Sequence, residues 1–139
     1  MQEFDSTFVR TPEPEVMEDQ EQCDAYANAD FSEANASFVA HWRTRFPEIR
    51  AGLWADFGCG PADIPARICA ELPEVSVAAA DASAAMIRLA EEAMGRQNLG
   101  ARVRLFCGLI SDLRIPDGGF HAIISNSLLH HLPDPTSIW

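Results

Sequence analysis

The sequence predicts an α/β protein with a doubly wound, mostly parallel sheet, and three observations lead to this class. From residue 51 onward, short apolar runs alternate with stretches of helical periodicity. The expected strands are apolar on both faces, as are the strands of a parallel sheet that helices cover. The first of these strands runs directly into a glycine-rich turn at Gly58 and Gly60. A layer of helices is expected to precede this sheet.

That preceding layer is an acidic segment at residues 1–50, which we expect to act as a lid on the domain at 51–139. The stretch 12–30 is rich in Asp and Glu, as a solvated helix face is. Its thin apolar stripe consists of Val16, Met17, Cys23, Tyr26 and Ala27. A second helix is expected between residues 31 and 46, with Asp30 or Ser32 as its N-cap and Pro47 as its stop.

The expected sheet of the main domain has four strands, at residues 53–57, 75–80, 102–106 and 120–126. The first crossover helix starts near Asp63, carries Pro65 in its first turn and ends before Pro73. The second has Ser83 as its N-cap, and Gly95 can serve as its C-cap.

Composition narrows the function classes. The net charge is −11 and the ten basic residues, all arginine, are scattered, so a nucleic-acid partner is not expected. The absence of lysine excludes a Schiff-base enzyme within this chain. The four cysteines form no C-x-x-C pair, so no metal site is expected. No apolar run approaches the roughly 20 residues of a membrane span, and no secretory signal is recognised, so we expect a cytoplasmic protein that acts on a small molecule.

The strongest motif is the run Asp56-Phe57-Gly58-Cys59-Gly60. Glycines at a strand-to-helix turn let the backbone approach a ligand closely. Two acids, Asp56 and Asp63, flank this turn, and they would repel a pyrophosphate but attract a cation. The alternative for Asp56 is a carboxylate that only satisfies the turn.

The second motif is Asp81, which ends the second strand 21 positions after Gly60. This is the spacing at which an acid reaches ribose hydroxyls, and a carboxylate can accept from both hydroxyls of the sugar. The same spacing also fits a nicotinamide-dependent oxidoreductase. The alternative role for Asp81 is to cap the following helix.

Taken in order, three motifs resemble those of the class I S-adenosylmethionine-dependent methyltransferases. The first is the glycine-rich run above, the second is Asp81-Ala82-Ser83-Ala84-Ala85-Met86, and the third is the segment 125–132. The resemblance implies a Rossmann-like fold with S-adenosyl-L-methionine as cofactor. It implies a site in which Gly58 and Gly60 line the methionine part, Asp81 binds the ribose and Asn126 lies beside the sulfonium, with Cys59 and Ala82 also among the cofactor-binding residues.

The sequence departs from the family pattern at three places. The acid that holds the adenine usually follows a glycine after the third strand, but Leu109 follows Gly108 here, which leaves Asp112 as the nearest candidate. The usual Phe-Asp pair at the fourth strand appears as Phe120-His121, and the third glycine of the first motif appears as Ala62.

Two further residues are candidates for the site. Tyr26 resembles the lid segment that related enzymes fold over the cofactor, although a packed tyrosine would look the same in sequence. His131 is the weak catalytic candidate, as a general base, whereas the pair His130-His131 could equally form a polar helix end.

Domains of this family continue into a further helix and three more strands, so we expect a C-terminally truncated domain. The leading hypothesis is methyl transfer to a small-molecule acceptor whose identity the sequence does not reveal. The alternatives are a truncated, non-catalytic remnant and, as a weaker one, the nicotinamide-dependent oxidoreductase.

Overall fold

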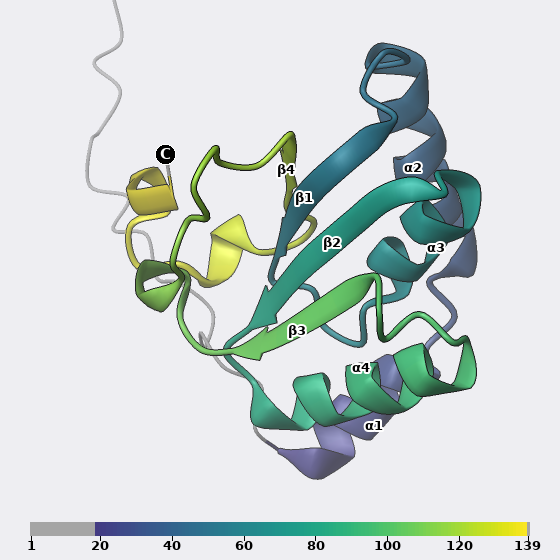
Figure 1. Ribbon diagram of the computed structural model, residues 1–139. Coiled ribbons are helices and arrows are strands. Elements are labelled where there is room, and N and C mark those ends of the chain that lie inside the picture. The colour runs from purple at the N-terminus through teal and green to yellow at the C-terminus, as the bar shows by residue number, and fades with distance from the viewer. Residues whose placement is uncertain (1–18, 139) are drawn as a thin grey trace, which may run out of the picture.

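A computed structural model describes residues 19–138, and its centre is one parallel four-stranded sheet (Figure 1). The strand order is β3-β2-β1-β4, which matches a doubly wound arrangement and confirms the predicted fold class. The strands are β1 (Ala51–Phe57), β2 (Glu74–Asp81), β3 (Val103–Cys107) and β4 (Ala122–Ile124).

The four α-helices gather on one side of the sheet (Figure 1). They are α1 (Gln20–Asn28), α2 (Ser32–Arg45), α3 (Asp63–Glu71) and α4 (Ala84–Arg96). Three short 3₁₀ turns occupy the C-terminal part, η1 (Ile110–Asp112), η2 (Leu129–His131) and η3 (Pro135–Ile138). Over the residues described, none of the helices has the length and apolar character to cross a membrane.

The two crossover helices start where their sequences predict. The Ser83 hydroxyl accepts a hydrogen bond from the Met86 N–H at 3.2 Å, which satisfies one of the unpaired donors of the first turn of α4. Pro65 lies in the first turn of α3, where a missing N–H costs nothing. Ala62 precedes α3 with a φ of 64°, a left-handed conformation that residues with a side chain rarely adopt.

The core lies between the sheet and the helices. Trp54 on β1 is fully buried, and its ring centroid is 4.2 Å from that of Trp42 on α2. Val77 on β2 and Met94 on α4 belong to the same cluster. Val39 of α2 also belongs to it, so the N-terminal layer shares the core of the main domain.

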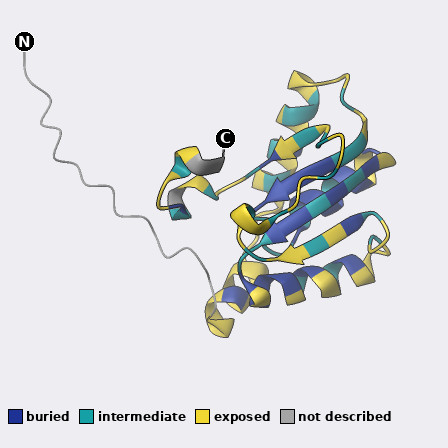
Figure 2. Cartoon of the chain, turned by 60° about the vertical axis from the view of Figure 1, so that its left-hand side comes forward, coloured by how far each residue is buried: buried dark blue, intermediate teal, exposed yellow. Residues whose placement is uncertain are grey.

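The opposite face of the sheet is more open (Figure 2). In the register of the strands, Ala55 aligns with Ile123, and Phe57 aligns through Ala80 with Phe106. Ile123 and Phe106 remain 56% and 45% exposed. The helices therefore cover one face of this sheet, and large apolar side chains stay accessible on the other.

Four local predictions differ from the structure. The fourth strand was expected to run to Asn126, but its pairing ends at Ile124, and the Ser125 hydroxyl donates to the Phe57 carbonyl instead. The second crossover helix passes Gly95 and ends at Arg96, and the left-handed residue after it is Asn98, whose short side chain tolerates that conformation.

The other two differences concern α2 and the histidine pair. The N-cap position of α2 is Phe31, which provides no side-chain hydrogen bond, while Asp30 accepts from the Ser32 N–H at 3.0 Å in a turn just before the helix. His131 ends a single 3₁₀ turn rather than an α-helix. Val16 and Met17 of the expected N-terminal stripe lie outside the described residues.

Candidate functional site

The glycine-rich turn is fastened to the carboxyl end of the neighbouring strand. The N–H groups of Gly58 and Cys59 both donate to the Ala80 carbonyl, at 2.8 and 2.9 Å. The Gly60 N–H donates to Asp81 Oδ2 at 2.9 Å. These three bonds hold the turn at the edge of the sheet where ligands of open α/β folds bind.

Gly58 is the position in this turn where only glycine fits. Its φ is +75°, a backbone angle that residues other than glycine rarely adopt. A Cβ at this residue would also lie 2.9 Å from a methyl carbon of Leu128. The turn therefore brings bare backbone up to the segment that follows β4.

Asp81 links the glycine-rich turn to the start of α4. Its Oδ1 accepts from the Ser83 N–H at 2.8 Å, so the carboxylate does stabilise the start of α4, and its Oδ2 holds the Gly60 N–H. Each carboxylate oxygen can accept a second hydrogen bond. The geometry thus leaves acceptor capacity on Asp81 for a ligand hydroxyl.

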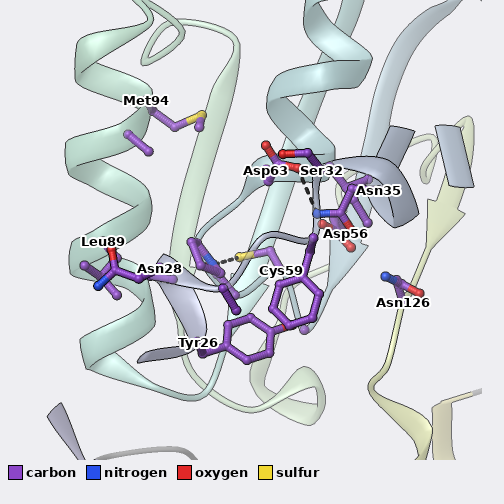
Figure 3. Close-up of a pocket in the computed structure, with 18 of the residues that line it drawn as sticks. Tyr26, Asn28, Ser32, Asn35, Asp56, Cys59, Asp63, Leu89, Met94 and Asn126 are labelled. Carbon is purple, nitrogen blue, oxygen red and sulfur yellow. Dashed lines mark hydrogen bonds between the residues drawn. The ribbon is translucent and has the colours of Figure 1, made fainter. Parts of the chain in front are cut away.

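A cavity of about 360 Å³ opens beside this turn (Figure 3). Six of the predicted site residues line it: Tyr26, Asp56, Gly58, Cys59, Gly60 and Asn126. The rest of the lining comes from the α1–α2 connection, the first turns of α2 and α3 and the second half of α4. The volume falls in the range of small-molecule sites in proteins, roughly 300–1,000 Å³.

Asp56 is the unusual side chain of the cavity. Only 3% of its surface is exposed, and the neighbouring strands place Ala79 and Ile124 beside it on the same face. No hydrogen bond to the Asp56 carboxylate is found within the described chain, and the side chain lines the cavity. Burial, and secondarily the nearby charge of Asp81, raises the pKa of Asp56 to about 7.

A buried carboxylate without a hydrogen-bond donor is costly in a folded protein. Such a group either holds a proton or receives a cation from outside. The cavity beside Asp56 gives a cationic ligand access to the carboxylate.

Cys59 takes part in the site through its backbone, and its thiol does not ionise to a thiolate. Burial raises the pKa of its thiol far above the ordinary value, and the charges of Asp56 and Asp81 raise it further. The thiol lies 3.5 Å from the Gly60 carbonyl oxygen, to which it donates (Figure 3). Cys59 therefore stays protonated and is not a nucleophile.

Tyr26 and Phe31 form an aromatic cover on the cavity. Their ring centroids are 4.9 Å apart, and a Cβ added to Gly60 would lie 3.8 Å from the Tyr26 ring. Partial burial raises the pKa of the Tyr26 phenol, as does, to a smaller extent, the charge of Asp81. The end of α1 thus extends over the glycine-rich turn.

A polar link that the sequence analysis missed joins α2 to the start of α3. The Asn35 amide donates to Asp63 Oδ2 at 2.8 Å (Figure 3). Arg67 Nε donates to the same oxygen at 2.7 Å. Asp63 and Asn35 both line the cavity. The i,i+4 spacing of Asp63 and Arg67 was visible in the sequence, but the partner 28 residues earlier was not.

The remaining predicted site residues lie elsewhere. Neither Asp81 nor Ala82 is among the residues that line the cavity, although Asp81 is hydrogen-bonded to the turn. Asp112 is exposed on η1, and His131 ends η2. Asn126 does line the cavity and faces it from the segment after β4 (Figure 3). The structure thus unites the β1 turn, Tyr26 and Asn126 around one space, with Asp112 and His131 outside its lining.

The sequence profile of one protein family, described as "Methyltransferase domain", matches residues 55–138. The chain belongs to the methyltransferase domain family. The match runs from the end of β1 through β4 and so includes the glycine-rich turn, Asp81 and Asn126.

Curated relatives of this methyltransferase domain include uncharacterized methyltransferases from Mycobacterium tuberculosis and Mycobacterium bovis. Each is 33% identical to the chain over 79 residues, which cover 57% of this chain and 37% of the relative. The matched region therefore spans little more than a third of the length of these relatives.

Solved structures share its fold at low sequence identity. One is a proposed S-adenosyl-L-methionine-dependent methyltransferase from Methanococcus maripaludis, with a TM-score of 0.72, 23% identity and coverage of 83% of this chain and 52% of that one. Another is the magnesium protoporphyrin IX methyltransferase of Synechocystis with bound S-adenosylhomocysteine, with a TM-score of 0.53, 18% identity and coverage of 80% and 43%.

Proposed function

We propose that this methyltransferase domain binds S-adenosyl-L-methionine and serves methyl transfer to a small-molecule acceptor. The observation that carries the proposal is the carboxylate of Asp56, which is buried, has no hydrogen-bond donor among the described residues and lines the cavity at the glycine-rich turn. The family membership of the chain points to the same chemistry.

The charge of the site favours this cofactor over a dinucleotide. S-adenosylmethionine carries an ammonium group and a sulfonium, either of which gains from an unpaired carboxylate in a shielded place. A pyrophosphate in the same cavity would face both Asp56 and Asp63. The solved neighbour from Synechocystis, which holds S-adenosylhomocysteine, supports the choice of cofactor class.

The proposed roles of the other residues follow their positions. The backbone of Gly58, Cys59 and Gly60 would line the amino-acid part of the cofactor, next to Asp56. Asp81, which keeps acceptor capacity beside the same turn, would bind the ribose hydroxyls.

The remaining parts of the proposed site come from outside the turn. Tyr26 on α1 would cover the cofactor as part of an N-terminal lid within residues 1–50. Asn126 would lie beside the reacting centre, and Ala82 would adjoin the sugar. Asp112 is the candidate for the adenine amino group, on an exposed turn that would have to approach the ligand.

When bound, S-adenosylmethionine supplies a methyl group activated by the positive sulfonium. The chain itself contributes position and exclusion of water. Asp56 fixes the cationic end, the turn at Gly58 brings the backbone close, and Tyr26 with Phe31 shields the cavity from solvent. Holding two reactants in line is sufficient to supply much of the rate enhancement of such a transfer.

Amide proton–nitrogen NMR of the 139-residue chain tests the proposal directly. Titration with S-adenosylhomocysteine should shift the signals of Gly58, Gly60 and Asp81, while NADH at the same concentrations should leave them in place. The variant Asp56→Asn should bind S-adenosylmethionine more weakly while its spectrum stays dispersed. Shifts with NADH alone would contradict the assignment and favour the oxidoreductase alternative.

A second candidate function is cofactor binding without catalysis. One observation favours it: His131, the general-base candidate, does not line the cavity. Transfer of a labelled methyl group from S-adenosylmethionine to any acceptor by the isolated chain, lost in Asp81→Ala, would rule out this candidate. Tight S-adenosylhomocysteine binding with no transfer to a broad acceptor panel would support it.

A further inference from the structure

The cavity extends beyond the glycine-rich turn into a space between α3 and α4 that the cofactor residues do not explain. Four apolar side chains line this part, which we name the helical arm: Ile64 of α3 and Leu89, Ala93 and Met94 of α4. Figure 3 shows Leu89 and Met94 on α4, opposite the segment that carries Cys59 and Asp63. Residues 27–29, at the end of α1 and just after it, border the same space.

The helical arm differs chemically from the end of the cavity that contains Asp56. Ile64 and Met94 are 8% and 2% exposed, so they present an apolar wall anchored in the core. Leu89 and Ala93 are half-buried on the neighbouring turns of α4. None of these four side chains carries a charge to pair with an ammonium group, and the only hydrogen-bond acceptor among them is the weak thioether sulfur of Met94.

The charged residues that line the cavity near the arm are Asp63 and Arg96, and acidic charge predominates because Asp56 lines the same cavity. Asp63 accepts from Arg67 and Asn35, and Arg96 lies 3.8 Å from Glu92 at the end of α4. The other polar side chains nearby are the amides of Asn28 and Gln97, which offer hydrogen bonds without a net charge. An anionic group placed in the arm would lose hydration against the apolar wall and would face the carboxylates of Asp56 and Asp63, with Arg96 as the one basic residue among those that line the cavity.

We propose that the helical arm binds the apolar body of a small uncharged molecule, such as an aromatic ring or a branched alkyl group. The arm is part of the same cavity as Asp56 and Asn126. The assignment of the helical arm as the subsite for the methyl acceptor rests on the proposed function. The binding of an apolar group in the arm does not depend on it. The acceptor class that follows is a neutral molecule with one compact apolar end.

The test uses 3-phenylpropan-1-ol as the probe and methionine methyl NMR as the readout. Met94 borders the arm, whereas Met86 lies on the same helix, is equally buried and packs with Cys23 in a separate cluster. We expect the Met94 methyl signal to shift saturably with the alcohol while the Met86 signal stays in place. The matched carboxylate, 3-phenylpropanoate, should bind roughly tenfold more weakly because its charge loses hydration in the arm and is repelled by Asp56 and Asp63 in the same cavity.

A pair of alanine variants on α4 provides the control. Ala93→Phe fills the arm and should abolish the Met94 response, whereas Ala84→Phe adds the same side chain at an exposed position and should preserve it. A shift of Met94 and Met86 together, or shifts confined to Phe106 and Ile123 on the open face of the sheet, would overturn the proposal. So would equal affinity for the alcohol and the carboxylate.

The same samples separate this inference from the proposed function. S-adenosylhomocysteine that shifts Gly58 and Gly60, with no response of Met94 to the alcohol, would overturn the arm and leave the cofactor assignment intact. Binding of the alcohol at Met94, with no response to S-adenosylhomocysteine, would support the arm and contradict the cofactor assignment.

Discussion

The Gly60 N–H and the Asp81 carboxylate, 21 positions apart in sequence, meet at 2.9 Å and fasten the turn after β1 to the end of β2. The other oxygen of the same carboxylate holds the Ser83 N–H at the start of α4. One side chain thus ties together two of the motifs that resemble the methyltransferase pattern. A ligand that hydrogen-bonds to Asp81 would therefore meet a carboxylate whose orientation is already fixed.

This arrangement predicts that Asp81→Ala weakens the binding of S-adenosylhomocysteine more than Asp81→Asn does. Asparagine keeps an acceptor for Gly60 but loses the charge, and alanine loses both. We expect S-adenosylhomocysteine affinity to fall about 10- to 100-fold in Asp81→Ala, since hydrogen bonds to a charged group contribute about 1.5–3 kcal/mol, and to fall less in Asp81→Asn. Calorimetric titration measures both, and unchanged affinity in Asp81→Ala would exclude the ribose role.

Asp56 predicts how the stability of the unliganded chain depends on pH. Its pKa is about 7 in the folded state against an ordinary 3.8, so between these values the unfolded chain ionises while the folded chain keeps the proton. Stability contributed by this group is complete below pH 4 and is lost as the pH rises to 7. The loss is on the order of 4 kcal/mol for a shift of this size.

Urea unfolding of the wild type and of Asp56→Asn, at pH 4.5 and pH 8, measures this effect. Other carboxylates titrate in both proteins and cancel in the difference. The variant should be the more stable protein at pH 8, and its advantage should shrink toward pH 4.5. A constant difference across the range would show that Asp56 is ionised throughout.

The same carboxylate predicts the pH dependence of cofactor binding. A cationic ligand pairs with ionised Asp56, so S-adenosylmethionine affinity should rise as the pH increases from 5 to 7 and then level off. At pH 5 roughly 1% of the group is ionised, so affinity should be down by as much as 100-fold. In Asp56→Asn the affinity should be low and nearly independent of pH over this range. A pH-independent wild type would contradict the pairing.

The parts of the site that could be predicted from the sequence are those that neighbouring residues in the sequence indicate. The positions of Gly58 and Gly60 at the end of a strand, and of Asp81 at the end of the next, were enough to expect that they meet, because parallel strands bring their carboxyl ends to one edge. Ser83 as N-cap also needed only its own neighbours. The family match, which covers these positions, is consistent with that expectation.

The parts that the sequence did not reveal depend on contacts between distant segments. The ring of Phe31 packs on Tyr26 only because the chain turns between α1 and α2. Asn35 reaches Asp63 because α2 lies on α3. Helix α4 continues past Gly95 and ends at Arg96, because a glycine within a helix is tolerated at modest cost and does not force a stop.

Arg102 is another such contact, and it predicts a stability effect. Its guanidinium donates to the carbonyls of Cys69, Leu72 and Val75, at distances from 2.6 to 3.1 Å, and so joins the end of α3 to β2. Arg102→Met should lower the free energy of unfolding by about 2–4 kcal/mol, because three carbonyls lose a charged donor. Arg104→Met, on the exposed side of β3, is the matched control and should change it by less than about 0.5 kcal/mol. Equal effects in urea unfolding would contradict this assignment.

The replacement of the usual Phe-Asp pair by Phe120-His121 has a structural consequence at Gly52. His121 Nδ1 accepts from the Leu53 N–H at 3.2 Å, and its ring lies so close to Gly52 that an added Cβ would be 2.4 Å from the same nitrogen. Gly52 also has a φ of +94°. Gly52→Ala should therefore be destabilising for two separable reasons, the collision with the ring and the strain of the backbone.

A double-mutant cycle separates these two causes. In the His121→Ala background the collision is gone, so Gly52→Ala should cost only the backbone strain of about 1–2 kcal/mol. In the wild-type background the same substitution should cost at least about 1 kcal/mol more, which the urea midpoints of the four proteins measure as a coupling energy. Additive effects would show that the histidine ring moves aside without cost, and that the contact between His121 and Gly52 does not restrict residue 52 to glycine.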